Sequence, residues 1–499
     1  MRVLMVYPRY PDTFWSFRHA IKVSTKRAVF PPLGLLTVAS MLPRDWQKKL
    51  IDMNTSKLSD RDILWADCVL VSAMVIQRES VKEVIQQCKK LGKKMIAGGP
   101  LFTSEYEEFS EVDHLVLDEA ETTLPPFLKD LEDGCAKHIY TSQERPDITK
   151  TALPMWSLLD MKKYTQMSLQ YSRGCPFDCD FCNIGVLNGR KVRTKGKSQI
   201  LRELDALYER GWRSGVFVVD DNFIGNKKKL KTEVLPAIID WQRERNFPFT
   251  LSTQVSINLS DDDEVLDLLV TAGFDAVFVG IESPNEESLV ECNKVQNEHR
   301  DIVASVQKLQ NHGLQVQAGF ILGFDSDPES VFNSQIRLVQ KSGIVMAMVG
   351  LLNAPRGTKL YRRMETEHRL TQEKATGDNT DCSMNFVPKM DGTVLAKGYR
   401  DVLTTLYSPG QYYKRIKVFL DQYRPRKRKA MSQLKWWHVW AWIRSLWFLG
   451  IVDSSRFHYW RFIISTAVNR PNTFLLSMTL AVYGFHFRKT IRKLGHAPV

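Results

Sequence analysis

The sequence predicts an α/β protein with a mainly helical C-terminal region. Between residues 1 and 145, short apolar strands alternate with segments of helical periodicity. From about 160 to 375, further strands end in polar or glycine-rich turns, and from about 380 the chain becomes basic and rich in tryptophan. Its 499 residues suffice for two or three domains. We place these domains at 1–145, 160–375 and 380–499.

The first region is expected to form a parallel, doubly wound sheet, with strands over 2–7, 49–53, 68–72 and 94–97. Such sheets bind ligands at the carboxyl ends of their strands. Gly98 and Gly99 lie at one of these ends and lack side chains, so the backbone there can approach a bulky ligand closely. A simple turn, completed by Pro100, is the alternative.

Three cysteines form the strongest functional signal in the chain. Cys175, Cys179 and Cys182 share one short loop, and the aromatic Phe181 precedes the last of them. Three thiolates on such a loop can each bind one iron of a cubane iron–sulfur cluster, which leaves the fourth iron open for chemistry. A zinc knuckle with a distant fourth ligand is the alternative, although the other cysteines are scattered singly.

Polar groups follow the apolar strand expected over 216–219. Asp220, Asp221 and Asn222 come directly after it, and two adjacent carboxylates need a cation or hydrogen-bond donors to stay ionised together. A surface turn is the alternative. A later strand, over 276–283, ends in Glu282 and Ser283, either of which could instead cap a following helix.

The cysteine spacing with its aromatic residue resembles the signature of the radical SAM superfamily. The runs at 220–223, 280–283 and 317–325 resemble later strand motifs of that superfamily, in the right chain order. The resemblance implies a partial (β/α)6 barrel over 160–375 and a [4Fe–4S] cluster on the three cysteines. It also implies S-adenosylmethionine at the open iron, split reductively to a 5′-deoxyadenosyl radical. The implied S-adenosylmethionine contacts are Phe181, Asp220, Asp221, Asn222, Thr253, Glu282, Ser283, Gly319 and Gly323.

The N-terminal region resembles the cobalamin-binding domain of many radical SAM proteins. The resemblance rests on the segment 30–35 and the Gly98-Gly99-Pro100 turn. The Asp-x-His-x-x-Gly motif, which supplies a histidine below cobalt in other cobalamin domains, is absent from the loop after the first strand, so that ligand is not expected. The implied cobalamin contacts are Tyr10, Ser72, Met74, Gly98, Gly99 and Pro100.

Over nearly its full length the chain resembles bacterial hopanoid C-2 methylases and their uncharacterised relatives. That resemblance implies a radical methyl transfer from methylcobalamin to an unactivated carbon of a hydrophobic, hopanoid- or isoprenoid-like lipid. An electron donor such as a ferredoxin or flavodoxin would supply electrons to the cluster. Three alternatives remain: a non-methylating radical reaction (cyclisation, oxidation or carbon–carbon bond formation), methylation of a polar natural product, and a non-catalytic zinc-binding, membrane-associated protein.

The tail is the most basic part of a chain whose formal net charge is +13. It holds a basic run at 424–429 and several tryptophans, of which Trp436 and Trp460 mark the ends. Amphipathic helices rich in tryptophan and arginine suit a membrane surface, although no stretch here supplies the ~20 apolar residues that span a bilayer. A helical cap packed on the barrel is the alternative, and nucleic acid is a weaker one. No secretory signal opens the chain, so we expect a cytoplasmic protein, peripheral at the inner face of the membrane.

Overall fold

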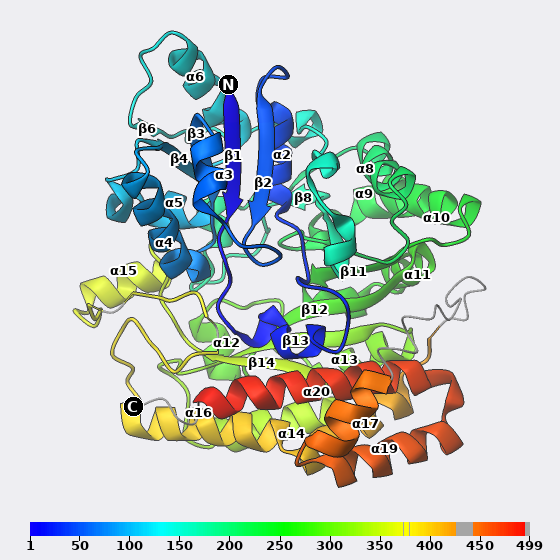
Figure 1. The fold of residues 1–499 in the computed structure, drawn as a ribbon. Coiled ribbons are helices and arrows are strands. Elements are labelled where there is room, and N and C mark those ends of the chain that lie inside the picture. The colour runs from blue at the N-terminus through cyan, green and yellow to red at the C-terminus, as the bar shows by residue number, and fades with distance from the viewer. Residues whose placement is uncertain (373, 379, 426–442, 495–499) are drawn as a thin grey trace.

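Two parallel sheets and a layer of C-terminal helices make up the fold (Figure 1). The computed structural model describes residues 1–372, 374–378, 380–425 and 443–494. In Figure 1 the first sheet lies at the top in blue, the second lies below it in green, and the helices of the tail run along the bottom in orange and red. The predicted α/β class and helical tail are confirmed.

The first sheet has the strand order β2-β1-β3-β4-β5-β6 and is parallel throughout. Its core lies on both faces, because Val3 and Met5 belong to one buried cluster whereas Leu4 and Val6 belong to another. The strand order reverses between β1 and β3, which is the switch point where open α/β sheets bind ligands. The strands are β1 (Arg2–Tyr7), β2 (Gln47–Asp52), β3 (Cys68–Ser72), β4 (Lys94–Gly98), β5 (His114–Val116) and β6 (Ile139–Tyr140).

Helices cover both faces of this sheet: α2 (Leu33–Met41), α3 (Asp60–Trp65), α4 (Arg78–Lys90), α5 (Pro100–Glu105) and α6 (Ala120–Glu132). In α4, the apolar residues Val81, Val84, Ile85 and Cys88 recur at helical spacing and are buried, while the charged residues between them face solvent. The sequence therefore predicts this helix to within two residues.

The second sheet is open, with the order β14-β13-β12-β11-β10-β7, and it is also parallel. Along β11, Leu251, Thr253 and Val255 are buried, whereas Ser252 and Gln254 are partly exposed. One face is therefore covered by helices and the other is accessible, as in a partial barrel. The strands are β7 (Gln166–Leu169), β10 (Gly215–Val218), β11 (Thr250–Val255), β12 (Phe274–Glu282), β13 (Gln315–Leu322) and β14 (Met346–Leu351). The helices between them include α8 (Lys197–Glu209), α10 (Leu235–Glu244), α11 (Asp263–Ala272), α12 (Glu286–Glu291), α13 (Ile302–Asn311) and α14 (Val331–Ser342).

A short antiparallel hairpin closes the base of the cysteine loop. It pairs β8 (Ser172–Arg173) with β9 (Arg193–Thr194), and Arg173 lies directly opposite Arg193. Both ends of the loop at 174–192 are thereby held together, and two arginines stand side by side at its base.

An N-terminal segment, residues 14–21, packs against the C-terminal helix. The 3-10 turn η1 (Phe14–Ser16) and α1 (Arg18–Ile21) lie against α20 (Phe474–Leu494), beside the second sheet (Figure 1). The Phe14 ring stacks on Phe487 with ring centroids 4.1 Å apart, and the buried His486 is hydrogen-bonded through Nε2 to the carbonyl oxygen of Phe14 at 2.9 Å. Residues 14–21 thus belong in space with the second sheet and the tail.

The tail packs α16 (Gly392–Tyr407) and α17 (Pro409–Gln422) on α14, and both α19 (Arg456–Asn469) and α20 contact α17. Within the described residues, no helix has both the length and the apolar character that crossing a bilayer requires. Most of the basic run at 424–429, together with Trp436, Trp437, Trp440 and Trp442, lies outside the described residues.

Arg415 of α17 is fully buried at the junction between the tail and the barrel. Its guanidinium donates to the carbonyl oxygens of Leu406 at 2.8 Å and Val345 at 3.3 Å, and it lies 5.3 Å and 5.2 Å from the ring centroids of Tyr407 and Tyr412. Burial lowers the Arg415 pKa. These contacts connect α16 and α17 to Val345, the residue just before β14.

We expect Arg415→Met to lower the free energy of unfolding by about 2–3 kcal/mol, because the two carbonyl oxygens lose their buried donor. The melting temperature should fall by several degrees. The exposed Lys414→Met on the same helix is the control and should stay within about 0.5 kcal/mol of the wild type. Equal melting temperatures for both variants would contradict this assignment.

Candidate functional site

The cysteine loop begins with a glycine that no other residue can replace without strain. Gly174 has φ +93°, and a Cβ added there would lie 2.8 Å and 2.9 Å from the carbonyl oxygens of Gly189 and Lys191. The loop thus folds back on itself, and the backbone N–H of Cys175 donates to the Gly189 carbonyl oxygen at 3.3 Å. This close approach brings the start and end of the loop together.

The thiols of Cys175, Cys179 and Cys182 face one another. Each interacts electrostatically with both of the others, and burial raises the pKa of all three, that of Cys182 to about 12. Among the described residues, no three His, Cys, Asp or Glu groups converge closely enough to hold a single metal ion. Three thiols on one loop are the donor set that a [4Fe–4S] cluster needs, with each sulfur on a different iron, and for these cysteines the ligation stays a prediction.

Two carboxylates after β10 anchor this loop. Asp221 accepts hydrogen bonds from the Gly174 N–H at 2.8 Å and from Asn188 Nδ2 at 2.9 Å, so it joins the two ends of the loop. Asp220 accepts from the Tyr171 N–H at 2.8 Å and from Ser172 Oγ at 2.5 Å. Burial raises the Asp220 pKa to about 7.

These contacts bear on the predicted S-adenosylmethionine site. Asp220 has no exposed surface, so the amino group could reach it only after the residues that cover it move. Asp221 is partly exposed, and for it the contact stays a prediction. Asn222 lies closest to the sulfurs, since it hydrogen-bonds the Cys175 thiol and donates to Ser256 Oγ at 3.1 Å.

A buried ion pair lies beside the sulfurs. Lys294 Nζ is 2.6 Å from Glu282 Oε1, and both side chains are about one-tenth exposed. Lys294 interacts electrostatically with Cys179 and Cys182 and lies 5.8 Å from the ring centroid of Phe181. Burial opposes the charge, but Glu282 and the sulfurs raise the Lys294 pKa. A fixed cation here stabilises the anionic sulfurs that a cluster needs.

The sequence did not single out Lys294. The lysine stands in an irregular segment after α12 and belongs to no motif, so only its place in the fold brings it to the thiols. Glu282 reaches it from a bulge at the end of β12, where its φ is +68°. The carboxylate itself was predicted, but its partner was not.

The remaining predicted contacts divide between the two faces of the sheet. Thr253 donates to the Val218 carbonyl oxygen at 3.0 Å and faces the helix-covered side. Ser283 Oγ accepts from the Asn285 N–H at 3.1 Å, which forms the turn before α12. Gly319 faces the accessible side, where an added Cβ would lie 3.0 Å from Phe278 Cζ. Gly323 has φ +100° and ends β13.

The predicted cobalamin residues gather at the carboxyl ends of β1, β3 and β4. The Tyr10 hydroxyl lies 3.4 Å from Met74 Sδ, and about half of the Met74 side chain is exposed. Gly99 has φ +93°, and a Cβ there would lie 2.5 Å from Ser72 Oγ. Gly98 and Pro100 flank Gly99. The residues thus lie together beside the switch point, where Met74 and Pro100 are exposed, and their contact with cobalamin stays a prediction.

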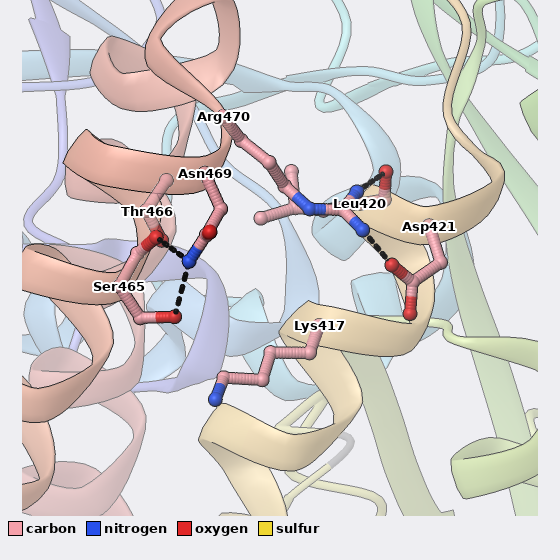
Figure 2. A pocket seen from close by; sticks show the side chains of 7 residues that line it. All are labelled: Lys417, Leu420, Asp421, Ser465, Thr466, Asn469 and Arg470. Atoms are coloured by element: carbon pink, nitrogen blue, oxygen red, sulfur yellow. Dashed lines mark hydrogen bonds and ion pairs between the residues drawn. The ribbon is translucent and has the colours of Figure 1, made fainter.

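A separate cleft of about 240 Å³ opens between α17 and α19 (Figure 2). The Arg470 guanidinium crosses it to the Leu420 carbonyl oxygen and the Asp421 carboxylate, and Lys417, Ser465, Thr466 and Asn469 complete its lining. None of the cofactor residues lines this cleft, and we assign its polar contacts to helix packing.

Comparisons with known proteins agree with this geometry. The model of the B12 binding domain matches residues 21–128, that of the radical SAM superfamily matches 169–334, and a domain of unknown function, DUF4070, matches 358–497. An uncharacterised methyltransferase of Synechocystis is 40% identical over 98% of this chain and 91% of its own length. The hopanoid C-2 methylase of Rhodopseudomonas palustris is 29% identical over 99% of this chain and 95% of its own.

Two solved structures share the fold. The cobalamin-dependent S-adenosylmethionine radical enzyme OxsB superposes with a TM-score of 0.64 at 14% identity, over 99% of this chain and 79% of that one. The radical S-adenosylmethionine methyltransferase TsrM of Kitasatospora setae gives 0.62 at 13%, over 99% and 100%. The cofactors of this chain are a [4Fe–4S] cluster, S-adenosylmethionine and cobalamin. The chain belongs to the family of radical SAM methyltransferases that carry an N-terminal B12-binding domain.

Proposed function

We propose that this methyltransferase acts on an unactivated carbon of a hydrophobic, hopanoid- or isoprenoid-like lipid. The observation that carries the proposal is the apolar character of the accessible face of the second sheet. Phe217, Phe278 and Met348 project from β10, β12 and β14 on that face, and each is partly exposed. Large apolar groups left accessible in the interior of an enzyme are typical of a site for an apolar ligand.

The N-terminal segment adds two more aromatic side chains to this face. The Trp15 ring meets Phe278 edge-on with centroids 5.4 Å apart, and its Nε1–H points to Met348 Sδ at 2.9 Å. The Phe30 ring lies 5.1 Å from that of Phe217, and about a third of Phe30 is exposed. These rings pack along the accessible face of the second sheet, where they can exclude water and hold a flat hydrocarbon.

When bound, the cluster with S-adenosylmethionine supplies a hydrogen-abstracting radical, and cobalamin supplies the methyl group. The protein itself orients the substrate and the cofactors and shields them from water. Lys294 holds positive charge beside the sulfurs, Asp221 keeps the cysteine loop closed, and Trp15 with Phe278 gives the substrate an apolar surface. The full-length similarity to the hopanoid C-2 methylase supports a polycyclic lipid as substrate. An external one-electron donor such as a ferredoxin or flavodoxin reduces the cluster in this proposal.

We also propose that the enzyme meets its substrate at the inner face of the membrane, through the tail. Among the described residues, nine of the twenty large apolar side chains that are exposed lie between 443 and 475. On α19, Phe457, Trp460, Ile464 and Val468 recur at helical spacing on one side, and Phe457 and Val468 are each 75% exposed. An apolar face of this size on a surface helix marks an interaction site.

The charges around this face favour an anionic surface. Residues 443–475 contain a single acidic residue, Asp453, which is buried and paired with Arg488 at 2.9 Å. Arg444, Arg456 and Arg461 are exposed. Apolar and arginine side chains with no exposed carboxylate between them suit anionic lipid headgroups.

The proposed function is tested by anaerobic incubation of the reconstituted enzyme with a lipid extract, an electron source and methyl-labelled S-adenosylmethionine. We expect a labelled lipid product that is heavier by one CH2, measured by mass spectrometry. A product without the label would instead indicate a non-methylating radical reaction, and label only in polar metabolites would indicate a polar substrate.

Cys175→Ala, Cys179→Ala and Cys182→Ala should each abolish cluster assembly and 5′-deoxyadenosine formation, because each sulfur ligates a different iron. Iron content, visible absorption and 5′-deoxyadenosine yield are the measurements. The exposed Cys135→Ala is the matched control and should keep all three. Full iron and activity in any of the three loop variants would refute the assignment.

The membrane face is tested with Phe457→Gln, Ile464→Gln and Val468→Gln combined. Because a fully buried apolar side chain contributes about 1.5–3 kcal/mol, co-sedimentation with anionic liposomes should weaken by at least about tenfold. High salt should also weaken binding by screening the arginines.

The control for that experiment combines Leu64→Gln, Val290→Gln and Val387→Gln, whose native side chains are 52–57% exposed on other parts of the surface. This variant should bind liposomes like the wild type. If the face is instead covered by another part of the protein, the α19 variant should lose thermal stability while liposome binding is negligible for every protein.

A further inference from the structure

A cluster of buried charges joins the cobalamin-binding domain to the cysteine loop. Glu119 lies at the start of α6, directly after the carboxyl end of β5. Its carboxylate accepts from Arg173 Nη1 at 2.7 Å and from Arg193 at 2.8 Å and 3.0 Å. Arg145 approaches it to 3.4 Å. The Glu119 side chain is only 8% exposed.

A second carboxylate of α6 strengthens the same junction. Glu121 accepts from Arg173 at 2.8 Å and 3.0 Å and from Thr151 Oγ1 at 2.8 Å. Burial opposes its ionisation, but Arg173 holds the Glu121 pKa below its ordinary value. Both carboxylates therefore come from the first domain, whereas Arg173, which both of them bind, and Arg193, which Glu119 binds, belong to the hairpin of the second.

The position of the two arginines indicates what this group of charges does. Arg173 precedes Gly174 and Cys175, and it stands opposite Arg193 across the hairpin that closes the loop. Two like charges in this register repel each other, and Glu119 binds both. Asp221, which accepts from Gly174, interacts electrostatically with the same two arginines. The base of the loop is thus held between carboxylates of both domains.

The other end of the junction lies at the cobalamin edge of the first sheet. Glu119 follows the carboxyl end of β5, and the residues assigned to cobalamin follow the carboxyl ends of β1, β3 and β4 in the same parallel sheet. The carboxyl ends of parallel strands lie along one edge of the sheet. One carboxylate therefore connects the edge that frames one cofactor to the loop that holds the other.

We propose that Glu119, with Arg173 and Arg193, is a positioning device that sets the distance and orientation between cobalt and the iron–sulfur cluster. It touches neither cofactor. Its effect is on the coupling of radical formation to methyl transfer, because a radical formed on the substrate is methylated only if the methyl donor lies within reach. Loosening this contact should leave both cofactors bound while 5′-deoxyadenosine is formed without methyl transfer.

The test uses Glu119→Gln in the full-length enzyme reconstituted with both cofactors. We expect normal iron and cobalamin contents and at least about a tenfold fall in methylated product per 5′-deoxyadenosine, in line with the rate cost of a small misplacement. Pulsed electron paramagnetic resonance between cob(II)alamin and the reduced cluster should show a broader distance distribution. This distance needs no substrate, so it stays informative if the proposed lipid is wrong.

The matched control is Asp453→Asn, which removes a buried carboxylate whose ion pair with Arg488 at 2.9 Å lies within the tail. It should lower thermal stability without changing the product ratio or the distance distribution. If Glu119→Gln fails to fold, Arg145→Gln replaces it, since that side chain is 31% exposed, with a smaller change expected in the same direction. An unchanged ratio and distance in whichever of these two variants folds would overturn the proposal.

Discussion

The whole site depends on keeping three thiols together on a loop whose own residues are mostly not buried. Carboxylates provide this constraint from two directions. Asp221 ties Gly174 to Asn188 from inside the barrel, and Glu119 binds the two arginines of the hairpin from the neighbouring domain. Since buried carboxylates and guanidinium groups are costly to leave unpaired, each side of this arrangement stabilises the other.

Much of the architecture could be predicted from sequence, because strand and helix periods repeat clearly in a doubly wound fold. The strands at 2–7 and 68–72 have the predicted bounds. β5 and β6 were missed, because two or three residues are too few to show a period. The position of residues 14–21 beside α20 could not be anticipated, since it depends on contacts such as Phe14 with Phe487, far apart in the chain.

The site divides in the same way. The three cysteines and Asp221 belong to compact motifs, so local spacing was enough to find them. Lys294 and Glu119 belong to no motif and reach the loop only through folding. For Thr253, the alternation of β11 was visible, but the sequence did not say which face the helices cover. Local patterns thus find the ligands, whereas the groups that hold and tune them require the tertiary structure.

Both proposed lipid contacts rest on large apolar groups that are exposed or partly exposed, in two separate regions of the structure. Trp15 packs on Phe278 at the accessible face of the second sheet, and Phe457 and Val468 lie on α19 of the tail. α20 connects these regions, because it packs on both α1 and α19. The proposed membrane lipid is a substrate that would give both surfaces a use.

The central claim is that one chain holds cobalamin and a cluster in a fixed relation, without a histidine below cobalt. It is tested most directly by anaerobic reconstitution with hydroxocobalamin, iron and sulfide, followed by metal analysis and electron paramagnetic resonance of cob(II)alamin. We expect about one cobalamin and about four irons per chain, with no histidine nitrogen coupled to cobalt, since the loop after β1 carries tyrosine and proline instead. A protein that gains its iron but retains no cobalamin would contradict it.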